Sequence, residues 1–384
     1  YVPSADRLTN GQSAFVRPGS ERYATAGSRQ AEDSLRKAAV VCDGRHADPV
    51  AARAWLAARA EAGLALSVDQ AQAVEGILTG GQQLSILIGP AGTGKSRVAA
   101  VLAEAWADPD LWGTPTPPGR MVGLAVSQNA ANVLAEQGMT AMNVRRWLTT
   151  QQRLTTGSAQ PADEAYRLGA GDVVLVDEAS MVDTADADAI RQHVQAAGAR
   201  WIWAGDHRQL GAVGAGGMMA DLAGTATTYE LAQVHRMNAE WERAASLRLR
   251  DGDLAVLADY ERHGRLRACP SLAHAEADAA RAWLADTLAG VPAAVVVATN
   301  DQAARLATQC RNDLIALGRI APDGVHLARQ STMAGVGDVV VTRTNHRRLA
   351  DVTGRRAEVW NRDRWTITEI RPDGALIVTP AGQD

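Results

Sequence analysis

The chain has 384 residues, which is enough for two or three domains. Hydrophobic residues make up 46% of it, so it can bury a sizeable core, and a net charge of −4 excludes a protein that is basic overall. Any nucleic-acid surface must therefore be a local basic stripe. Cys42, Cys269 and Cys310 are far apart and odd in number, which argues against a disulfide framework and indicates a reducing compartment. No Cys/His spacing resembles a zinc site, and the apolar runs are too short to cross a bilayer.

The N-terminal part, residues 1–66, is predicted to be a lead-in with short helices. Residues 1–30 are rich in Ser, Gly and Arg and indicate a loop, whereas Ala, Leu and Trp recur at helical spacing over 31–63 and predict two helices. The first residues lack the basic and apolar regions of a signal peptide. Because the chain begins at Tyr1 and ends directly after a strand-like run, we expect both ends to be cuts through a longer protein.

The next segment, residues 67–236, shows strands alternating with helices. A helix is predicted over 66–81, with Ser67 as its N-cap and Gly80–Gly81 at its end, and it is followed by a buried strand over 84–89. The pattern then predicts, in order, a helix at 97–107, a Pro-rich loop at 108–120, a strand at 121–127, a helix at 128–138, a strand at 172–177, a helix at 185–198 and a strand at 200–206. Such alternation predicts a parallel sheet with helices on both faces.

The C-terminal third changes character twice. Residues 237–290 are predicted to form the mostly helical end of the first domain and a linker. The run "AAVVVATN" at 293–300 predicts a strand and 301–318 a helix, so that 291–335 has the pattern of a second α/β domain beginning. Residues 336–384 are β-like, with the turn signal "RPDG" at 371–374 between two alternating strands.

A phosphate-binding loop is the strongest motif in the chain. "GPAGTGKS" at 89–96 fits the pattern G-x-x-x-x-G-K-[ST] in full, and it stands between a strand and a helix. Its glycines let backbone N–H groups curl around phosphate oxygens, and the start of the helix adds its positive end. In this pattern Lys95 reaches the β- and γ-phosphates and Ser96 binds Mg²⁺. The predicted nucleotide-binding residues here are Gly89, Pro90, Ala91, Gly92, Thr93, Gly94, Lys95, Ser96 and Arg97.

Two carboxylates follow a later apolar strand in "VLVDEASMVD" at 174–183. A charged pair next to a core strand costs free energy unless a cation or a reaction requires it. We expect the strand of Asp177 to lie beside the strand of the phosphate loop, so that Asp177 holds Mg²⁺ together with Ser96. Glu178 is then placed to orient and deprotonate an attacking water. In "WAGDHRQLGAV" at 203–213, another strand ends so that Gln209 can sense a γ-phosphate.

Taken in order, Gln70 in "SVDQAQAV", the loop at 89–96, "VDEASM" and "GDHRQL" resemble the superfamily 1 DNA helicases of the RecD-like branch. The resemblance spans about 66–384 and is closest to the helicase part of MobF-type conjugative relaxases. It implies an α/β fold with a P-loop RecA-like motor domain, a partial second RecA-like domain and a small β-rich insert. It also implies that Gln70 reads adenine. "YELAQVHRM" at 229–237 resembles the segment that carries the arginine finger of that family, which makes Arg236 a catalytic candidate beside Lys95, Glu178 and Gln209.

Contacts to single-stranded DNA are predicted at polar residues that follow strands. The candidates are Ser127, Gln128, Asn129, Arg146, Thr299 and Asn300. Each is equally a helix cap or part of a solvated face. The stripe "RTNHRRLADVTGRR" at 343–356 holds five arginines and precedes Trp360 and Trp365. Such a stripe suits strand binding, and it equally suits the outer face of a small barrel with tryptophan in its core.

The resemblance implies an ATP-dependent DNA helicase or translocase in which hydrolysis of Mg²⁺-ATP moves single-stranded DNA with 5′→3′ polarity. It further implies ATP and Mg²⁺ as cofactors, single-stranded DNA and conjugation machinery as partners, and the cytoplasm as the location. The later "TxHxxQG"-like and "LTR"-like helicase motifs do not occur in the sequence, so we expect weak hydrolysis and unwinding by the chain itself. The alternatives are another P-loop DNA-stimulated ATPase, an exonuclease V α-type helicase subunit, or a non-catalytic nucleic-acid-binding fragment.

Overall fold

The computed structural model describes residues 24–113, 118–327, 332–350 and 356–381. The chain divides into two compact units, Tyr1–Gly252 and Asp253–Asp384. Most of the predicted N-terminal loop, four residues of the Pro-rich loop, residues 351–355 of the basic stripe and the last three residues lie outside the described part. Within the described ranges, no helix combines the length and apolar character needed to span a bilayer.

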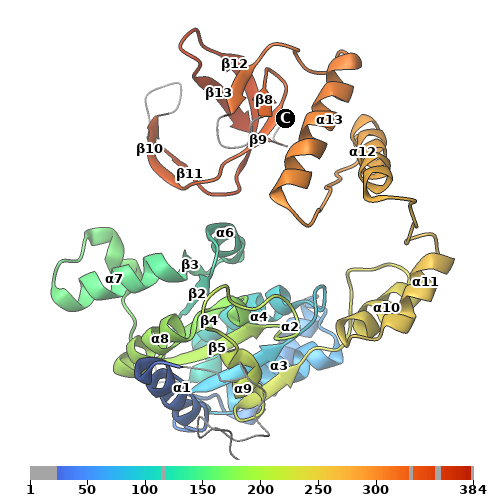
Figure 1. Cartoon of the computed structure of the whole chain (residues 1–384). Coiled ribbons are helices and arrows are strands. Elements are labelled where there is room, and N and C mark those ends of the chain that lie inside the picture. The colour runs from blue at the N-terminus through green and yellow to red at the C-terminus, as the bar shows by residue number, and fades with distance from the viewer. Residues whose placement is uncertain (1–23, 114–117, 328–331, 351–355, 382–384) are drawn as a thin grey trace, which may run out of the picture. The chain divides into compact units, whose positions relative to one another are not determined.

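The first unit is built on a six-stranded sheet in which every pairing is parallel (Figure 1). The strand order is β3-β2-β4-β5-β1-β6. The strands are β1 (Leu84–Ile88), β2 (Met121–Ala125), β3 (Thr140–Asn143), β4 (Val173–Val176), β5 (Arg200–Gly205) and β6 (Thr227–Glu230). Strands β1, β2, β4 and β5 are buried along their whole length, as expected for a sheet covered on both faces.

Helices cover both faces of the sheet, which confirms the predicted architecture (Figure 1). One core contains residues of α2 (Pro49–Glu61), α3 (Val68–Thr79), α4 (Lys95–Ala107) and α6 (Gln128–Glu136). The other contains residues of α1 (Ala26–Ala39), α7 (Val144–Thr156), α8 (Thr184–Ala197) and α9 (Met218–Ala223). Alternation along β1 joins the two cores, because Leu87 packs in the first and Ile86 and Ile88 pack in the second.

The order of the strands corrects one prediction about the site. The strand of Asp177, β4, does not lie beside β1, because β5 pairs with both of them. The prediction was wrong because strands that follow one another in the chain need not be neighbours in a parallel sheet, where each connection crosses over a face. As a result the residue that follows β5, Asp206, lies between the phosphate loop and the carboxylates of β4.

Strand β5 also carries bulky side chains into the core. Trp201 and Trp203 are each 1% exposed, and their rings meet edge to face with centroids 5.3 Å apart. At the start of the strand Arg200 is 1% exposed, and its guanidinium donates to the carbonyls of Ile77, Gln82 and Arg45. Burial lowers the pKa of Arg200 to about 10, and these carbonyls satisfy the buried cation.

Local helix signals account for several elements, and several others were missed. The predicted N-cap of α3 is confirmed, since Ser67 and Gln70 form a capping box. Helix α1 begins at Ala26, inside the predicted loop, and α5 (Pro109–Trp112) lies within the predicted Pro-rich loop. Strand β3 and the long helix α7 occupy a region for which no element was predicted. Helix α10 (Glu240–Arg250) is the last helix of the first unit.

The second unit combines helices with short antiparallel strands. Its helices are α11 (Leu257–Arg262), α12 (Leu272–Leu288) and α13 (Asn300–Ala316). Strands β13 (Leu376–Pro380), β12 (Arg364–Ile370) and β9 (Val339–Val341) form an antiparallel sheet in that order, while β7 (Val325–Leu327) pairs with β8 (Thr332–Ala334) and β10 (His346–Ala350) with β11 (Arg356–Val359). The predicted β-rich part and the turn at 371–374 are confirmed, with Gly374 at φ +83°.

The predicted strand at 293–300 is wrong. Residues 291–297 have no regular secondary structure, although α13 follows as predicted. An apolar run becomes a strand only where another strand can pair with it, and none of the described strands of this unit does so. The side chain of Val296 is accordingly 92% exposed. The start of a second RecA-like domain at 291–335 therefore stays a prediction.

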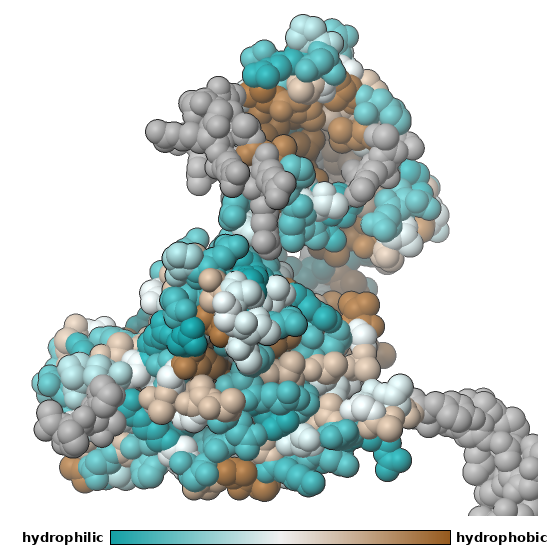
Figure 2. Space-filling model, turned by 90° about the vertical axis from the view of Figure 1, so that its left-hand side faces the viewer, coloured by the Kyte–Doolittle hydropathy of each residue, from teal (hydrophilic) through white to brown (hydrophobic). Residues whose placement is uncertain are grey.

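The surfaces of the two units differ in character. Figure 2 shows apolar surface on the second unit, whereas the first unit is mostly hydrophilic in that view. Exposed apolar side chains in the β-rich part include Met333, Val336, Val339 and Val341.

Candidate nucleotide-binding site

A cleft of about 1490 Å³ opens at the carboxyl ends of β1, β4 and β5. This is the edge at which open parallel sheets bind ligands. Eleven of the predicted site residues line the cleft, all from the first unit. They are Gln70, Ala91, Gly92, Gly94, Lys95, Ser96, Arg97, Asp177, Glu178, Gln209 and Arg236. Of the other predicted nucleotide-binding residues, Gly89, Pro90 and Thr93 belong to the same loop but do not line the cleft.

The phosphate loop has the backbone that its glycines predict. Gly92 and Gly94 both have φ +85°, a conformation that favours glycine. Gly94 precedes α4, which begins at Lys95, so the positive end of this helix faces the cleft. Thr93 is fully buried, and its hydroxyl donates to the carbonyl of Pro90 at 2.9 Å. This hydrogen bond joins two residues of the loop and stabilises its conformation.

The ammonium group of Lys95 bonds to its own loop. Its Nζ donates to the carbonyls of Gly89 and Pro90, the latter at 3.2 Å. Burial lowers the pKa of Lys95; Arg236 and Arg250 lower it further, while Asp177 and Asp206 raise it. A phosphate would supply the negative charge that this partly desolvated cation lacks.

Gln70 holds the loop through both ends of its side-chain amide. Its Nε2 donates to the carbonyl of Thr93 at 2.9 Å, and its Oε1 accepts the N–H of Ser67 at 3.1 Å. A β-carbon on Gly94 would lie 2.4 Å from this Nε2. Gln70 therefore braces the phosphate loop against the start of α3, and its predicted contact with adenine stays a prediction.

The two carboxylates after β4 both have a raised pKa, and the backbone of Glu178 lies in the left-handed region. Glu178 has φ +51°, which is uncommon for any residue other than glycine and is found mostly at functional sites. Burial raises the pKa of Asp177, and burial together with the charge of Asp177 raises the pKa of Glu178. A raised pKa makes Glu178 a stronger base than an ordinary carboxylate, as base catalysis near neutral pH requires.

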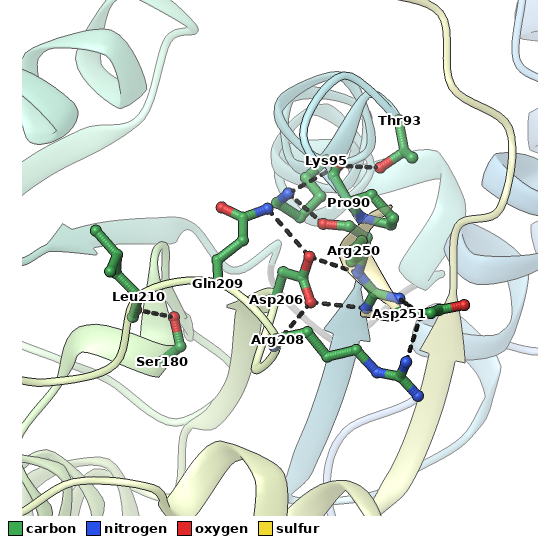
Figure 3. Close-up of polar contacts among 11 residues, drawn as sticks. Pro90, Thr93, Lys95, Ser180, Asp206, Arg208, Gln209, Leu210, Arg250 and Asp251 are labelled. Carbon is green, nitrogen blue, oxygen red and sulfur yellow. Dashed lines mark hydrogen bonds and ion pairs between the residues drawn. The ribbon is translucent and has the colours of Figure 1, made fainter. Parts of the chain in front are cut away.

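Asp206 is the centre of a polar network that the sequence analysis did not single out (Figure 3). It is 3% exposed, and its carboxylate accepts two hydrogen bonds from Arg250, at 2.8 and 2.7 Å. It also accepts Nε2 of Gln209 at 3.0 Å and the backbone N–H of Arg208 at 3.1 Å. Burial would raise the pKa of Asp206, but the bonds from Arg250, Arg208 and Gln209 lower it overall, so the group is ionised. The signal available in the sequence was its position at the end of a buried strand.

Arg236 reaches the cleft through backbone contacts of its segment. The N–H of His235 donates to the carbonyl of Gly92 at 2.8 Å. Farther along the segment, the carboxylate of Asp69 accepts the N–H groups of Ala232 and Gln233 at 2.8 and 3.1 Å. Asp69 was also missed, although it adjoins Gln70 in the motif. The site thus brings Arg236, Lys95 and Gln209 to one cleft, as the resemblance predicts.

Magnesium fits this set of donors. None of the described parts of the chain holds three His, Cys, Asp or Glu side chains grouped as metal ligands. Mg²⁺ in nucleotide sites keeps several waters and binds through one or two protein oxygens plus the phosphates. Ser96 and Asp177 both line the cleft and supply such oxygens. The phosphates of the nucleotide and water molecules would complete the coordination shell of a Mg²⁺ ion held there.

The predicted DNA contacts of the first unit lie at the ends of β2 and β3. Ser127 caps α6 by accepting the N–H of Ala130 at 3.1 Å, and Asn129 is exposed. Gln128 accepts a bond from Asn143 at 2.8 Å, and Asn143 in turn caps the helix that carries Arg146. These cap roles are structural, and contact with DNA stays a prediction.

In the second unit Thr299 caps α13 in a capping box with Gln302, and Asn300 is the first residue of that helix. Of the tryptophans after the basic stripe, Trp360 is 9% exposed and Trp365 is half-buried. Trp360 at least therefore packs inside the β-rich part, as the barrel alternative predicted, instead of offering a face for stacked bases.

Comparison with known proteins identifies the family of the chain. The AAA domain family matches residues 65–271, more than half of the chain. The chain is also 28% identical over 203 residues to a probable conjugal transfer protein TraA of Sinorhizobium fredii and, over the same length, to the conjugal transfer protein TraA of Agrobacterium fabrum and that of Rhizobium radiobacter. The matched region is 52% of this chain but only 17% of each relative. With the P-loop, the carboxylate pair and the glutamine motif in one cleft, the chain belongs to the AAA domain family, a RecD-like family of helicase-type P-loop NTPases.

Proposed function

We propose that this chain is the motor segment of a conjugative relaxase, in which hydrolysis of Mg²⁺-ATP drives movement along single-stranded DNA with 5′→3′ polarity. One observation carries the proposal: Lys95, Glu178, Gln209 and Arg236 line a single cleft although they come from four separate segments of the chain. The names of the relatives support the conjugative context.

The roles follow from the geometry and charge of the site. In this proposal the loop and Lys95 hold the phosphates. Ser96 and Asp177 would hold a Mg²⁺ ion, which would screen the charge of the phosphates. Glu178, exposed to the cleft and with a raised pKa, takes the proton of the attacking water. Arg236 offsets charge that develops on the γ-phosphate, and Gln209 orients the reacting groups.

Contact with DNA is assigned to the ends of β2 and β3. Ser127 and Asn129 follow β2 at the same edge of the sheet as the cleft, because all strands of the sheet run in parallel. The amides and hydroxyls there suit a sugar–phosphate backbone, as a motor that moves on any sequence requires.

The test is ATP hydrolysis by the chain with and without single-stranded DNA. We expect DNA to stimulate hydrolysis, and Glu178→Gln to reduce it by roughly 10²–10⁴-fold while nucleotide binding is retained. Glu164→Gln is the matched control, since Glu164 is exposed, does not line the cleft and accepts two hydrogen bonds from Arg167. Absence of nucleotide binding, or a hydrolysis rate that is the same with and without single-stranded DNA, would overturn the proposal.

A further inference from the structure

The buried pair of Asp206 and Arg250 has a place in the site that phosphate binding alone does not explain. Arg250 does not line the cleft, but its guanidinium makes two parallel bonds with a carboxylate that does (Figure 3). Two-point pairing fixes the plane of a carboxylate, which a single bond does not. Asp206 is therefore held in one orientation at the end of β5, between the phosphate loop and the carboxylates of β4.

The fixed carboxylate of Asp206 in turn orients the side-chain amide of Gln209. A carboxylate only accepts hydrogen bonds, so the 3.0 Å contact with Asp206 decides which end of the Gln209 amide carries the nitrogen. The Nε2 group has two hydrogens, and one of them is donated to Asp206. The other stays available at a side chain that lines the cleft.

The network ends at the boundary of the first unit. Arg250 is the last residue of α10, and the following Asp251 accepts a bond from Arg208 and lies 3.6 Å from Arg250. The first unit ends at Gly252. Arg208 and Gln209 thus bind two neighbouring acidic groups that are both tied to the end of α10.

We propose that Arg250 is a positioning residue that sets the Gln209 amide for the γ-phosphate through Asp206, and thereby ties the γ-phosphate site to the end of α10. This inference rests on the proposed function, because it needs a nucleotide triphosphate in the cleft. Without Arg250, Asp206 keeps a buried charge whose strongest partner is gone, and such a charge recruits other donors. Gln209 already bonds to Asp206, and Lys95 lines the same cleft, so both would be drawn away from the phosphates.

The experiment compares affinities for a non-hydrolysable ATP analogue and for ADP. In Arg250→Ala we expect the preference for the analogue over ADP to fall about tenfold, a typical coupling between sites, with ADP affinity nearly unchanged. Gln209→Ala should lower the same ratio, and the double variant should be no worse than Gln209→Ala alone, because Arg250 acts through Gln209. Arg250→Lys, which keeps the charge but loses two-point pairing, should lie between wild type and Arg250→Ala.

Arg153→Ala is the matched control. Arg153 makes the same two-point pair with the buried Asp163, but in α7 and away from the cleft. It should lower thermal stability and leave the ratio of affinities unchanged. A second readout is hydrogen exchange of residues 240–250, which the ATP analogue should slow more than ADP does in wild type but not in Arg250→Ala.

The outcomes separate the two proposals. If wild type does not prefer the analogue to ADP and does not hydrolyse ATP, the proposed function fails. If wild type hydrolyses ATP but Arg250→Ala lowers both affinities equally, or if the effects of Arg250→Ala and Gln209→Ala multiply, the positioning role is wrong and the pair is only structural.

Discussion

Gly92 of the phosphate loop packs closely against the segment that carries Arg236. A β-carbon on Gly92 would lie 2.4 Å from the β-carbon of Arg236, and the carbonyl of Gly92 accepts the N–H of His235 at 2.8 Å. The phosphate loop and the candidate arginine finger are thus packed together. Changes in this contact should affect the chemistry of the cleft more than the stability of the fold.

Gly92→Ala tests this contact. We expect it to weaken nucleotide binding by at least about tenfold, or roughly 1.4 kcal/mol, because the new methyl group displaces the segment of Arg236. Gly138→Ala is the control, since Gly138 has nearly the same φ, +84°, but nothing within 4 Å of a β-carbon. Both variants should lose about 1–2 kcal/mol of stability through backbone strain, and only Gly92→Ala should change binding in a titration with a fluorescent nucleotide. Equal binding by both variants would contradict the prediction.

Asp69→Ala should release the same segment from its other side. Asp69 accepts the N–H groups of Ala232 and Gln233, so its loss should lower kcat about tenfold through Arg236, with a smaller change in KM. Asp48→Ala is matched to it, because Asp48 also accepts two backbone N–H groups, at 2.9 and 3.0 Å, but at the start of α2. That control should cost about 1 kcal/mol of stability and leave kcat unchanged. Similar kcat values in the two variants would show that the segment holds its position without Asp69.

Lys95 should react with acylating reagents at lower pH than an ordinary lysine. Burial lowers its pKa, so its neutral amine is present at pH values where an exposed lysine is still protonated. The sequence contains only one other lysine, Lys37, which is exposed and serves as an internal reference. Trace labelling across pH, read by mass spectrometry, should give a lower midpoint for Lys95, and Mg²⁺-ATP should protect Lys95 but not Lys37. Identical profiles for the two lysines would contradict the prediction.

Asp177→Asn should make the protein more stable at pH 8. The pKa of Asp177 is raised in the fold, so the folded state binds its proton more tightly than the unfolded chain does. Its ionised form therefore destabilises the fold above the raised pKa, and this cost disappears as the pH falls to the ordinary value near 4. The thermal midpoint of Asp177→Asn should exceed that of wild type at pH 8, and the two should converge in acid.

Asp163→Asn should show the opposite sign in the same experiment. Its bonds with Arg153 lower the pKa of Asp163 to about 2, so the ionised form stabilises the fold at neutral pH. This stabilisation is present above the ordinary pKa and is lost as the pH falls toward 2. Asp163→Asn should therefore melt below wild type at pH 8. If both substitutions shift the midpoint in the same direction, the charges do not act as described.

The sequence predicted the site residues better than it predicted their arrangement. The phosphate loop, the capped helix before it and the carboxylate pair each have a local signal, because glycine, N-cap and strand-end chemistry depends on nearby residues. The order of β4 and β5 has no local signal, since it depends on which face each crossover passes. The same holds for Arg250 and Asp69, whose partners are 44 and 163 residues away in the chain.

The failed strand at 293–300 has a related cause. Its apolar residues favour a buried strand. Strand formation also requires a second segment that can pair with the first, and the prediction rested on the first segment alone. Strand β3 and α7 were missed for a different reason, because α7 is amphipathic with many polar residues and β3 has only four. Both depend on packing against β2 and α8 more than on their own composition.

The edge-to-face rings of Trp201 and Trp203 give β5 a spectroscopic signal of its own. Trp203 and Trp201 are buried three and five residues before Asp206, on the strand that separates the phosphate loop from the carboxylates. Fixed aromatic rings give near-ultraviolet circular dichroism that vanishes when tertiary packing is lost. The strand that organises the cleft therefore carries two of the ten tryptophans of the chain, and a rearrangement there contributes to the near-ultraviolet signal without an attached dye.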